Sequence, residues 1–107
     1  MIAMATTVIN GKELVVDDEG FMTQYDEWDE NIGQELATAI GVDMTDDHWK
    51  VIRFLRDDFQ AEGETPTIRR VSTAGGVDTK TLFRLFPKKP AKKMSYIAGL
   101  PKPHGCV

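Results

Sequence analysis

The residues with the most reactive side chains lie at the carboxyl end of the chain, in the segment PKPHGCV. Cys106 is the single cysteine among 107 residues, so it cannot form a disulfide within the chain. A thiolate is a strong nucleophile, and neighbouring positive charge lowers the pKa of a thiol. His104 and Lys102, two and four residues before the cysteine, are candidates for tuning the thiol or for docking a partner.

The segment that carries the thiol is predicted to be an arm rather than part of a core. Pro101 and Pro103 each lack a backbone N–H and favour an extended conformation in the preceding residue, so a helix cannot continue through them. We therefore expect a domain over residues 1–98 and a flexible C-terminal arm over residues 99–107. Such an arm is suited to deliver Cys106 into the active site of another protein, and the alternative is an inert terminal cysteine.

The start of the chain predicts a β-hairpin. Residues 6–9 and Lys12–Val16 are rich in Thr, Val, Ile and Leu, and Asn10 and Gly11 lie between them. Asn-Gly is typical of a two-residue hairpin turn, because both central residues of a type I′ turn need a positive φ.

Two amphipathic helices are predicted to follow the hairpin. The first covers residues 27–40, and the second begins after the N-cap Thr45 and ends at Gly63. Each helix has an apolar residue on nearly every turn. These are Trp28, Ile32, Leu36 and Ile40 in the first helix and Trp49, Ile52, Leu55 and Phe59 in the second. We interpret both tryptophans as core anchors.

Three shorter helices complete the predicted fold, over residues 66–74, 79–86 and 90–98. Thr65 is the expected N-cap of the first of them, with Pro66 at its first position. The first two are joined by a Gly-Gly turn, which is the outline of a helix-turn-helix. The predicted fold class is therefore mainly α (α+β), with an N-terminal β-hairpin packed on a small helical domain that contains a helix-turn-helix, followed by the flexible arm.

Charge is distributed unevenly along the chain. Residues 1–64 carry sixteen acidic and four basic side chains, whereas residues 65–107 carry nine basic side chains and one acidic. The basic portion can attract an anionic partner, or the two portions can neutralise each other in the folded domain. Arg84 lies on the second helix of the predicted helix-turn-helix, so nucleic acid is one candidate for such an anionic partner. Against this, the pI of about 5.1 is too low for an autonomous DNA-binding domain.

The sequence predicts a cytoplasmic protein with no membrane partner. No apolar run approaches the roughly 18 residues of a membrane span, and no secretory signal is evident. A lone thiol is suited to a reducing compartment. No metal or cofactor is predicted, because His48, His104 and Cys106 do not have the spacing of a zinc site and no glycine-rich phosphate loop occurs.

Several segments of the chain resemble the DsrC/TusE family of sulfur-carrier proteins. PAKK at residues 90–93 and AGLPKPHGCV at residues 98–107 are similar to the C-terminal signature of that family. Further similar blocks occur in the same order as in the family, and they are DDEGFM at 17–22, DDHWKVIRFLRD at 46–57, PTIR at 66–69 and LFRLFP at 82–87. The resemblance implies a hairpin on a mainly helical domain with a flexible terminal arm.

The resemblance also implies a role for Cys106. In such proteins the penultimate cysteine accepts sulfur as a persulfide and passes it on. Arg69 and Lys102 match positions that the family tends to fill with the same residue types, whereas His104 replaces a Thr or a small residue. Together with Arg84, these three residues are candidates for thiol tuning or docking.

Two departures from the family pattern bear on the partner. Members associated with sulfite reductase carry a second cysteine eleven residues before the penultimate one, where this chain has Ser95. A hydroxyl cannot form a disulfide or trisulfide, so the resemblance moves toward TusE-like carriers that relay sulfur to a tRNA 2-thiouridylase. The connection at residues 74–78 is also shorter than the Gly/Lys-rich segment of many members.

The expected function is that of a sulfur-relay carrier rather than a stand-alone enzyme. The implied partners are a sulfur-donor protein and a sulfur-acceptor enzyme, either a thiouridylase or a sulfite reductase-like protein, with tRNA involved indirectly. One alternative is a DsrC-like subunit, partner or regulator of a dissimilatory sulfite reductase-type complex. The other is a DNA-binding regulator that uses the helix-turn-helix.

Overall fold

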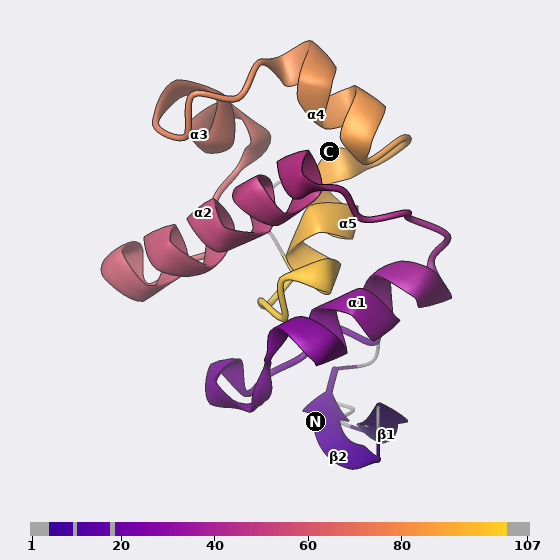
Figure 1. The fold of residues 1–107 in the computed structure, drawn as a ribbon. Helices are drawn as coiled ribbons and strands as arrows, with labels where there is room; N and C mark the ends of the chain where they lie inside the picture. The colour runs from indigo at the N-terminus through magenta and orange to yellow at the C-terminus, as the bar shows by residue number, and fades with distance from the viewer. Residues whose placement is uncertain (1–4, 10, 18, 103–107) are drawn as a thin grey trace.

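The computed structural model describes residues 5–9, 11–17 and 19–102. The elements follow one another as a hairpin, a single 3-10 turn and a set of helices (Figure 1). They are β1 (Ala5–Ile9), β2 (Lys12–Val16), η1 (Tyr25–Glu27), α1 (Glu30–Ala39), α2 (Asp46–Glu62), α3 (Ile68–Thr73), α4 (Thr79–Leu85) and α5 (Pro90–Ile97). The predicted fold class, a hairpin on a mainly helical domain, is confirmed.

The predicted hairpin is present and lies at the end of the molecule opposite α3 and α4 (Figure 1). β1 and β2 pair antiparallel, with Ile9 opposite Lys12. Gly11 has a φ of 79°, as a tight turn between the strands requires. Leu14 and Val16 point inward and are buried with side chains of α1, so the hairpin is held to the helical domain by its apolar face.

The start of α1 differs from the prediction, while both ends of α2 agree with it. Residues 28 and 29 are extended, because the Asp29 carboxylate accepts a hydrogen bond from the Ile32 amide at 2.9 Å and so caps a helix that begins at Glu30. Thr45 is the N-cap of α2, and the His48 ring accepts a hydrogen bond from the Thr45 amide at 3.1 Å. Gly63 ends α2 in the left-handed conformation, with a φ of 78°.

The helix-turn-helix is formed by α3 and α4, which pack against each other. The predicted N-cap of α3 was wrong. The hydroxyl of Thr67, not that of Thr65, accepts the capping hydrogen bond from the Arg70 amide at 3.1 Å, and the helix begins at Ile68 rather than at Pro66. Two threonines flank Pro66, and the Thr65 hydroxyl is engaged elsewhere, so the cap falls to the second threonine.

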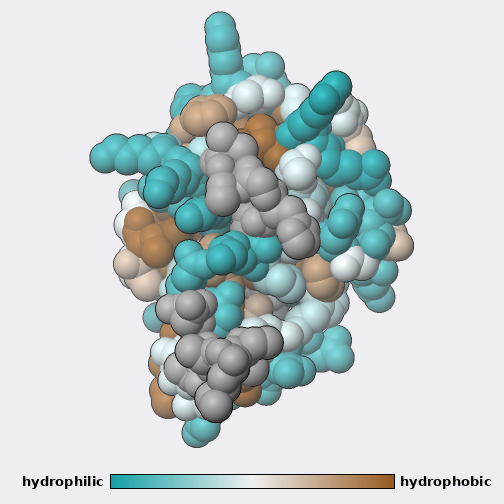
Figure 2. Space-filling model, turned by 180° about the vertical axis from the view of Figure 1, so that it is seen from behind, coloured by the Kyte–Doolittle hydropathy of each residue, from teal (hydrophilic) through white to brown (hydrophobic). Residues whose placement is uncertain are grey.

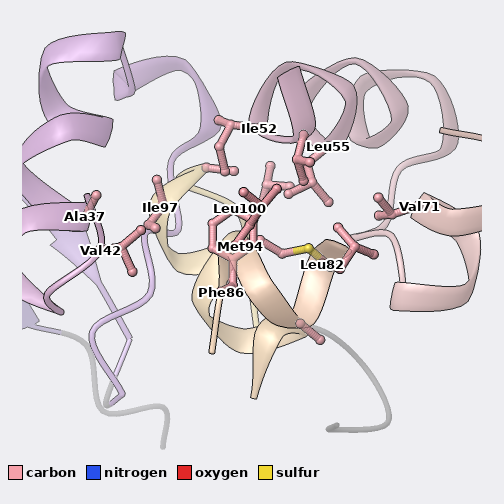
Figure 3. Packing of buried hydrophobic residues seen from close by; sticks show 14 residues of the cluster. Ala37, Val42, Ile52, Leu55, Val71, Leu82, Phe86, Met94, Ile97 and Leu100 are labelled. Carbon is pink, nitrogen blue, oxygen red and sulfur yellow. The ribbon is translucent and has the colours of Figure 1, made fainter. Parts of the chain in front are cut away.

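The core lies around α5, which packs against α1, α2 and α4 (Figure 1). Ile52 and Leu55 from α2 lie around Met94 of α5 and Leu100, and all four side chains are fully buried (Figure 3). Burial of each such side chain contributes about 1.5–3 kcal/mol. Trp28 and Trp49 are half-buried and pack against this core, in agreement with their interpretation as anchors.

The surface seen in Figure 2 is largely hydrophilic, with small and separate hydrophobic areas. Among the described residues, no helix has both the length and the apolar character needed to cross a membrane.

Candidate functional site

The described chain ends at Lys102, four residues before the thiol, and its last six residues lie against the domain. Cys106 and His104, the first two residues singled out by the sequence, lie outside the described residues. Leu100 is fully buried, and its amide donates a hydrogen bond to the Ser95 carbonyl at 3.1 Å. The segment that leads to the thiol is therefore packed on the domain as far as this buried leucine.

Three side chains hold the backbone of this segment, residues 97–102, by its carbonyl groups. The Trp28 indole N–H donates to the Ile97 carbonyl at 2.8 Å. One Arg56 Nη atom donates to the Ala98 carbonyl at 2.8 Å. The Thr65 hydroxyl donates to the Pro101 carbonyl at 2.9 Å. The three donors come from the segment before α1, from α2 and from the connection to α3, so three separate parts of the chain meet at one place.

Arg56 lies against two aromatic rings. Its guanidinium carbon lies 3.9 Å from the centre of the Tyr25 ring and 4.1 Å from that of Trp28, within the range of cation–π attraction. Its second Nη atom donates to the Tyr25 carbonyl at 3.1 Å. Burial lowers the pKa of Arg56, while Tyr25, Asp26 and Asp57 act in the opposite direction. An arginine remains protonated under such conditions, so the group is a fixed positive charge beside the end of α5.

Gly99 allows the chain to turn closely past Trp28. A Cβ atom at this position would lie 2.3 Å from Trp28 Cδ1 and 3.0 Å from the Met22 sulfur. The φ of Gly99 is 70°, which side chains rarely permit. Only glycine satisfies both conditions, which explains why the helix ends here and the chain continues directly into the contacts of Leu100.

Lys102, a predicted tuning or docking residue, is placed at the end of this segment. Its ammonium group forms a salt bridge with the Glu19 carboxylate in the connection after β2. Both side chains are partly exposed, with relative accessibilities of 48% and 38%. An ion pair this exposed contributes no more than about 1 kcal/mol to the free energy of unfolding. It therefore adds little to the stability of the domain.

Arg69 and Arg84 take no part in the hydrogen bonds that hold residues 97–101. Arg69 is exposed on α3, and Arg84 is exposed on α4. Arg84 lines a cavity of about 440 Å³ together with the buried ring of His48 and with Lys88. The docking roles of both arginines stay predictions.

The outer face of α4 is formed by Lys80, Phe83 and Arg84, all of them exposed. The Phe83 side chain is 48% exposed and has positive charge on either side of it in the helix. An exposed aromatic ring between basic side chains is suited to bind an acidic partner. DNA binding by the helix-turn-helix stays a prediction. Among the described residues, no group of three or more His, Cys, Asp or Glu side chains is placed to hold a metal ion.

Ser95, which replaces the second cysteine of some family members, is fully buried on α5. Among the described residues its hydroxyl has no hydrogen-bond partner, although its carbonyl accepts the Leu100 amide. A buried hydroxyl without a partner lowers the stability of the fold. Position 95 therefore carries a hydroxyl instead of a thiol, and among the described residues this hydroxyl makes no hydrogen bond.

The roles of the three donors to residues 97–101 are not evident from the sequence. The sequence predicts a core anchor at Trp28 and a helix cap at Thr65, and it assigns no role to Arg56. Their hydrogen bonds join residues 69, 42 and 36 positions apart. No local pattern signals contacts over such distances.

The fold and the site together define a class of protein, a small hairpin-and-helix domain that holds the base of a cysteine-bearing terminal segment. A family model described as DsrC like protein matches residues 8–107. The chain belongs to this DsrC-like family, as the resemblance of its terminal motif implied.

Relatives that carry a functional name match nearly the whole chain. Proteins named Sulfurtransferase TusE from Shigella dysenteriae serotype 1 and from Escherichia coli K12 are each 36% identical over 107 residues. Each of these matches covers 94% of this chain and 98% of the relative.

Solved structures of the family have the same fold. DsrC from Allochromatium vinosum superposes with a TM-score of 0.82 at 33% identity and covers 100% of both chains. The oxidized gamma-subunit of the dissimilatory sulfite reductase (DsrC) from Archaeoglobus fulgidus gives a TM-score of 0.78 at 38% identity, covering 96% of this chain and 100% of that one.

Proposed function

We propose that this protein is a sulfur-relay carrier that holds sulfur as a persulfide on Cys106 and passes it to an acceptor protein. Membership of a family whose relatives are named sulfurtransferases supports the relay role. The observation that carries the persulfide proposal is the position of the single thiol, four residues beyond a segment that the domain holds by its backbone.

The proposed reaction is a thiol exchange that needs no added oxidant. The Cys106 thiolate attacks the outer sulfur of a persulfide on a donor protein, and the donor leaves as its thiolate. The outer sulfur keeps its proton, so the product is Cys106–S–SH. In the second step a nucleophile of the acceptor takes this outer sulfur and the Cys106 thiolate is released. The protein returns to its starting state after each transfer.

The acceptor is proposed to be an enzyme that forms 2-thiouridine in tRNA, in the cytoplasm. Ser95 supports this choice, because a hydroxyl at this position cannot close a disulfide with Cys106. The persulfide must then be discharged by another protein rather than within the chain. The carrier itself contacts the enzyme, and tRNA takes part only through that enzyme.

A second candidate is a partner or regulator of a sulfite reductase-type complex. The superposition on a chain described as a gamma-subunit of dissimilatory sulfite reductase favours it. Affinity purification of the tagged protein from its own cells separates the two proposals. Recovery of a tRNA-modifying enzyme supports the first, and recovery of a sirohaem protein in its place supports the second.

The direct test of the persulfide is mass spectrometry of the C-terminal peptide. The protein is incubated with a persulfide-loaded sulfurtransferase, and the variant Cys106→Ser serves as control. We expect a gain of about 32 Da, one sulfur atom, on the wild-type peptide and none on the variant. Absence of this gain under conditions that load an established carrier would contradict the proposal.

A further inference from the structure

We propose that Trp28, Arg56 and Thr65 form a collar that fixes where the arm leaves the domain, and thereby sets how far Cys106 reaches into a partner. The inference rests on the proposed function, because reach matters only if the thiol is delivered to another protein. It assigns a positioning role to three side chains, none of which belongs to the arm itself.

The collar acts on backbone groups that a helix end leaves without partners. The last carbonyls of a helix have no intrahelical donor and are commonly satisfied by water. At the end of α5, the Ile97 carbonyl is bound by Trp28 and the Ala98 carbonyl by Arg56. A positive charge at a helix C-terminus is further favoured by the helix dipole. Helix termination and fixation of the arm are thus achieved by the same two side chains.

Thr65 extends the hold beyond the helix. Its side chain is buried, and its hydroxyl binds the Pro101 carbonyl at 2.9 Å, three residues after the carbonyl bound by Arg56. Leu100, between these two points, is fully buried. The segment is therefore bound by hydrogen bonds on both sides of Leu100. Leu100 cannot leave the core without breaking at least one of these bonds.

The position of the last fixed residue determines the reach of the thiol. A chain spans at most about 3.6 Å per residue, so with residues up to 102 held, Cys106 stays within about 14 Å of Lys102. If the segment were released back to Ile97, nine residues would separate the thiol from the last fixed point, and the radius would rise to about 32 Å. The accessible volume would grow about tenfold, and the effective concentration of the thiol at a docked partner would fall accordingly.

Two variants weaken the collar, and each has a matched control. Arg56→Lys keeps the charge but cannot reach two carbonyls with a planar fork. Its control is Arg53→Lys, one turn earlier on α2, where the arginine is exposed and pairs with the Glu30 carboxylate at 3.5 Å. Thr65→Val keeps the side-chain shape and removes the hydroxyl. Its control is Thr38→Val, whose hydroxyl bonds within α1 on the surface.

The first measurement reports on the hold alone and does not depend on sulfur transfer. Hydrogen exchange of the Leu100 amide follows opening of the segment, and we expect it to be about tenfold faster in Arg56→Lys and in Thr65→Val than in the two controls. A nitroxide attached to Cys106, the single cysteine, should broaden amide signals over a wider part of the domain in the two collar variants. Unchanged exchange and an unchanged pattern of broadening would overturn the collar.

The second measurement links the collar to delivery of the thiol. Transfer of sulfur from a persulfide-loaded donor protein to Cys106 should fall to about a tenth of the wild-type rate in the collar variants. Alkylation of Cys106 by iodoacetamide, which needs no docking, should stay within about twofold of wild type. Transfer that remains at the wild-type rate despite faster exchange would overturn the proposed role in reach. If the wild-type protein itself accepts no sulfur, the proposed function fails, and exchange and nitroxide broadening still decide whether the collar exists.

Discussion

Residues 97–102 and the outer face of α4 differ in how their side chains are used. The first region contains a fully buried leucine and backbone carbonyls bound by Trp28, Arg56 and Thr65. The second exposes Phe83 between basic residues that leave their charge in solvent. The first region is thus fixed on the domain, whereas the second is exposed to solvent, and we propose that the first positions the thiol and the second meets a partner.

The largest effect on stability is expected from a substitution that crowds the turn at Gly99. Gly99→Ala places a Cβ atom against Trp28 and forces an alanine into the left-handed region, so we expect a loss of about 4 kcal/mol in the free energy of unfolding. Gly41→Ala is the control, because its φ of 76° is equally unfavourable but nothing lies within 4 Å of the added carbon. It should lose only about 1 kcal/mol. Urea unfolding measures both, and equal losses would show that the contact with Trp28 does not matter.

Truncation of one apolar side chain in each region comes next in size. Leu100→Ala should cost about 3 kcal/mol, because it leaves a cavity in the core beside α5. Phe83→Ala should change the free energy of unfolding by less than about 0.5 kcal/mol, since nearly half of the ring is in solvent. A large loss in the Phe83 variant, read from its thermal midpoint, would mean that this face stabilises the fold rather than serving a partner.

A smaller effect with the opposite sign is expected at Ser95. Ser95→Ala removes a buried hydroxyl that has no partner among the described residues, and should raise the free energy of unfolding by about 1 kcal/mol. Ser72→Ala gains the same helix propensity but loses a hydroxyl that accepts a hydrogen bond from Thr79 at 3.4 Å. A stabilisation no larger than that of Ser72→Ala in denaturant titrations would argue for a partner that satisfies Ser95.

The smallest effect on the fold, and a visible one on association, is expected at Arg84. Arg84→Gln should leave stability within about 0.5 kcal/mol of wild type, because the side chain is exposed. It should slow association with the acceptor protein about twofold at low salt, and the difference should vanish as salt increases. Surface plasmon resonance at two salt concentrations tests this, with Arg53→Gln as the control on another surface. An equal slowing in both variants would remove the outer face of α4 from the interface.

Elements with local signals were predicted well from the sequence. The Asn-Gly turn identified the hairpin, and Thr45 and Gly63 marked both ends of α2. The start of α3 was wrong because two threonines flank one proline and only packing decides which hydroxyl caps the helix. Local chemistry thus determines where most elements begin and end, while tertiary contacts decide the ambiguous cases.

The site was predicted only in part, for a physical reason. Cys106 was identified by its place at the chain end and by the terminal motif, both of which are local properties. Arg56 resembles any surface arginine of an amphipathic helix, and nothing near it in sequence indicates that it binds the Ala98 carbonyl. The groups that position the arm come from segments far apart in the chain, so they emerge only when the fold brings those segments together.

The most direct test of the proposed sulfur relay follows one labelled sulfur atom through a single turnover. A donor protein loaded with ³⁵S persulfide is mixed with the wild-type protein and the acceptor enzyme, and the label on each protein is measured over time. We predict that label rises and then falls on the C-terminal peptide containing Cys106 as it accumulates on the acceptor, and that Cys106→Ser abolishes both. Arrival of the label at the acceptor at an unchanged rate with Cys106→Ser would contradict a relay through Cys106.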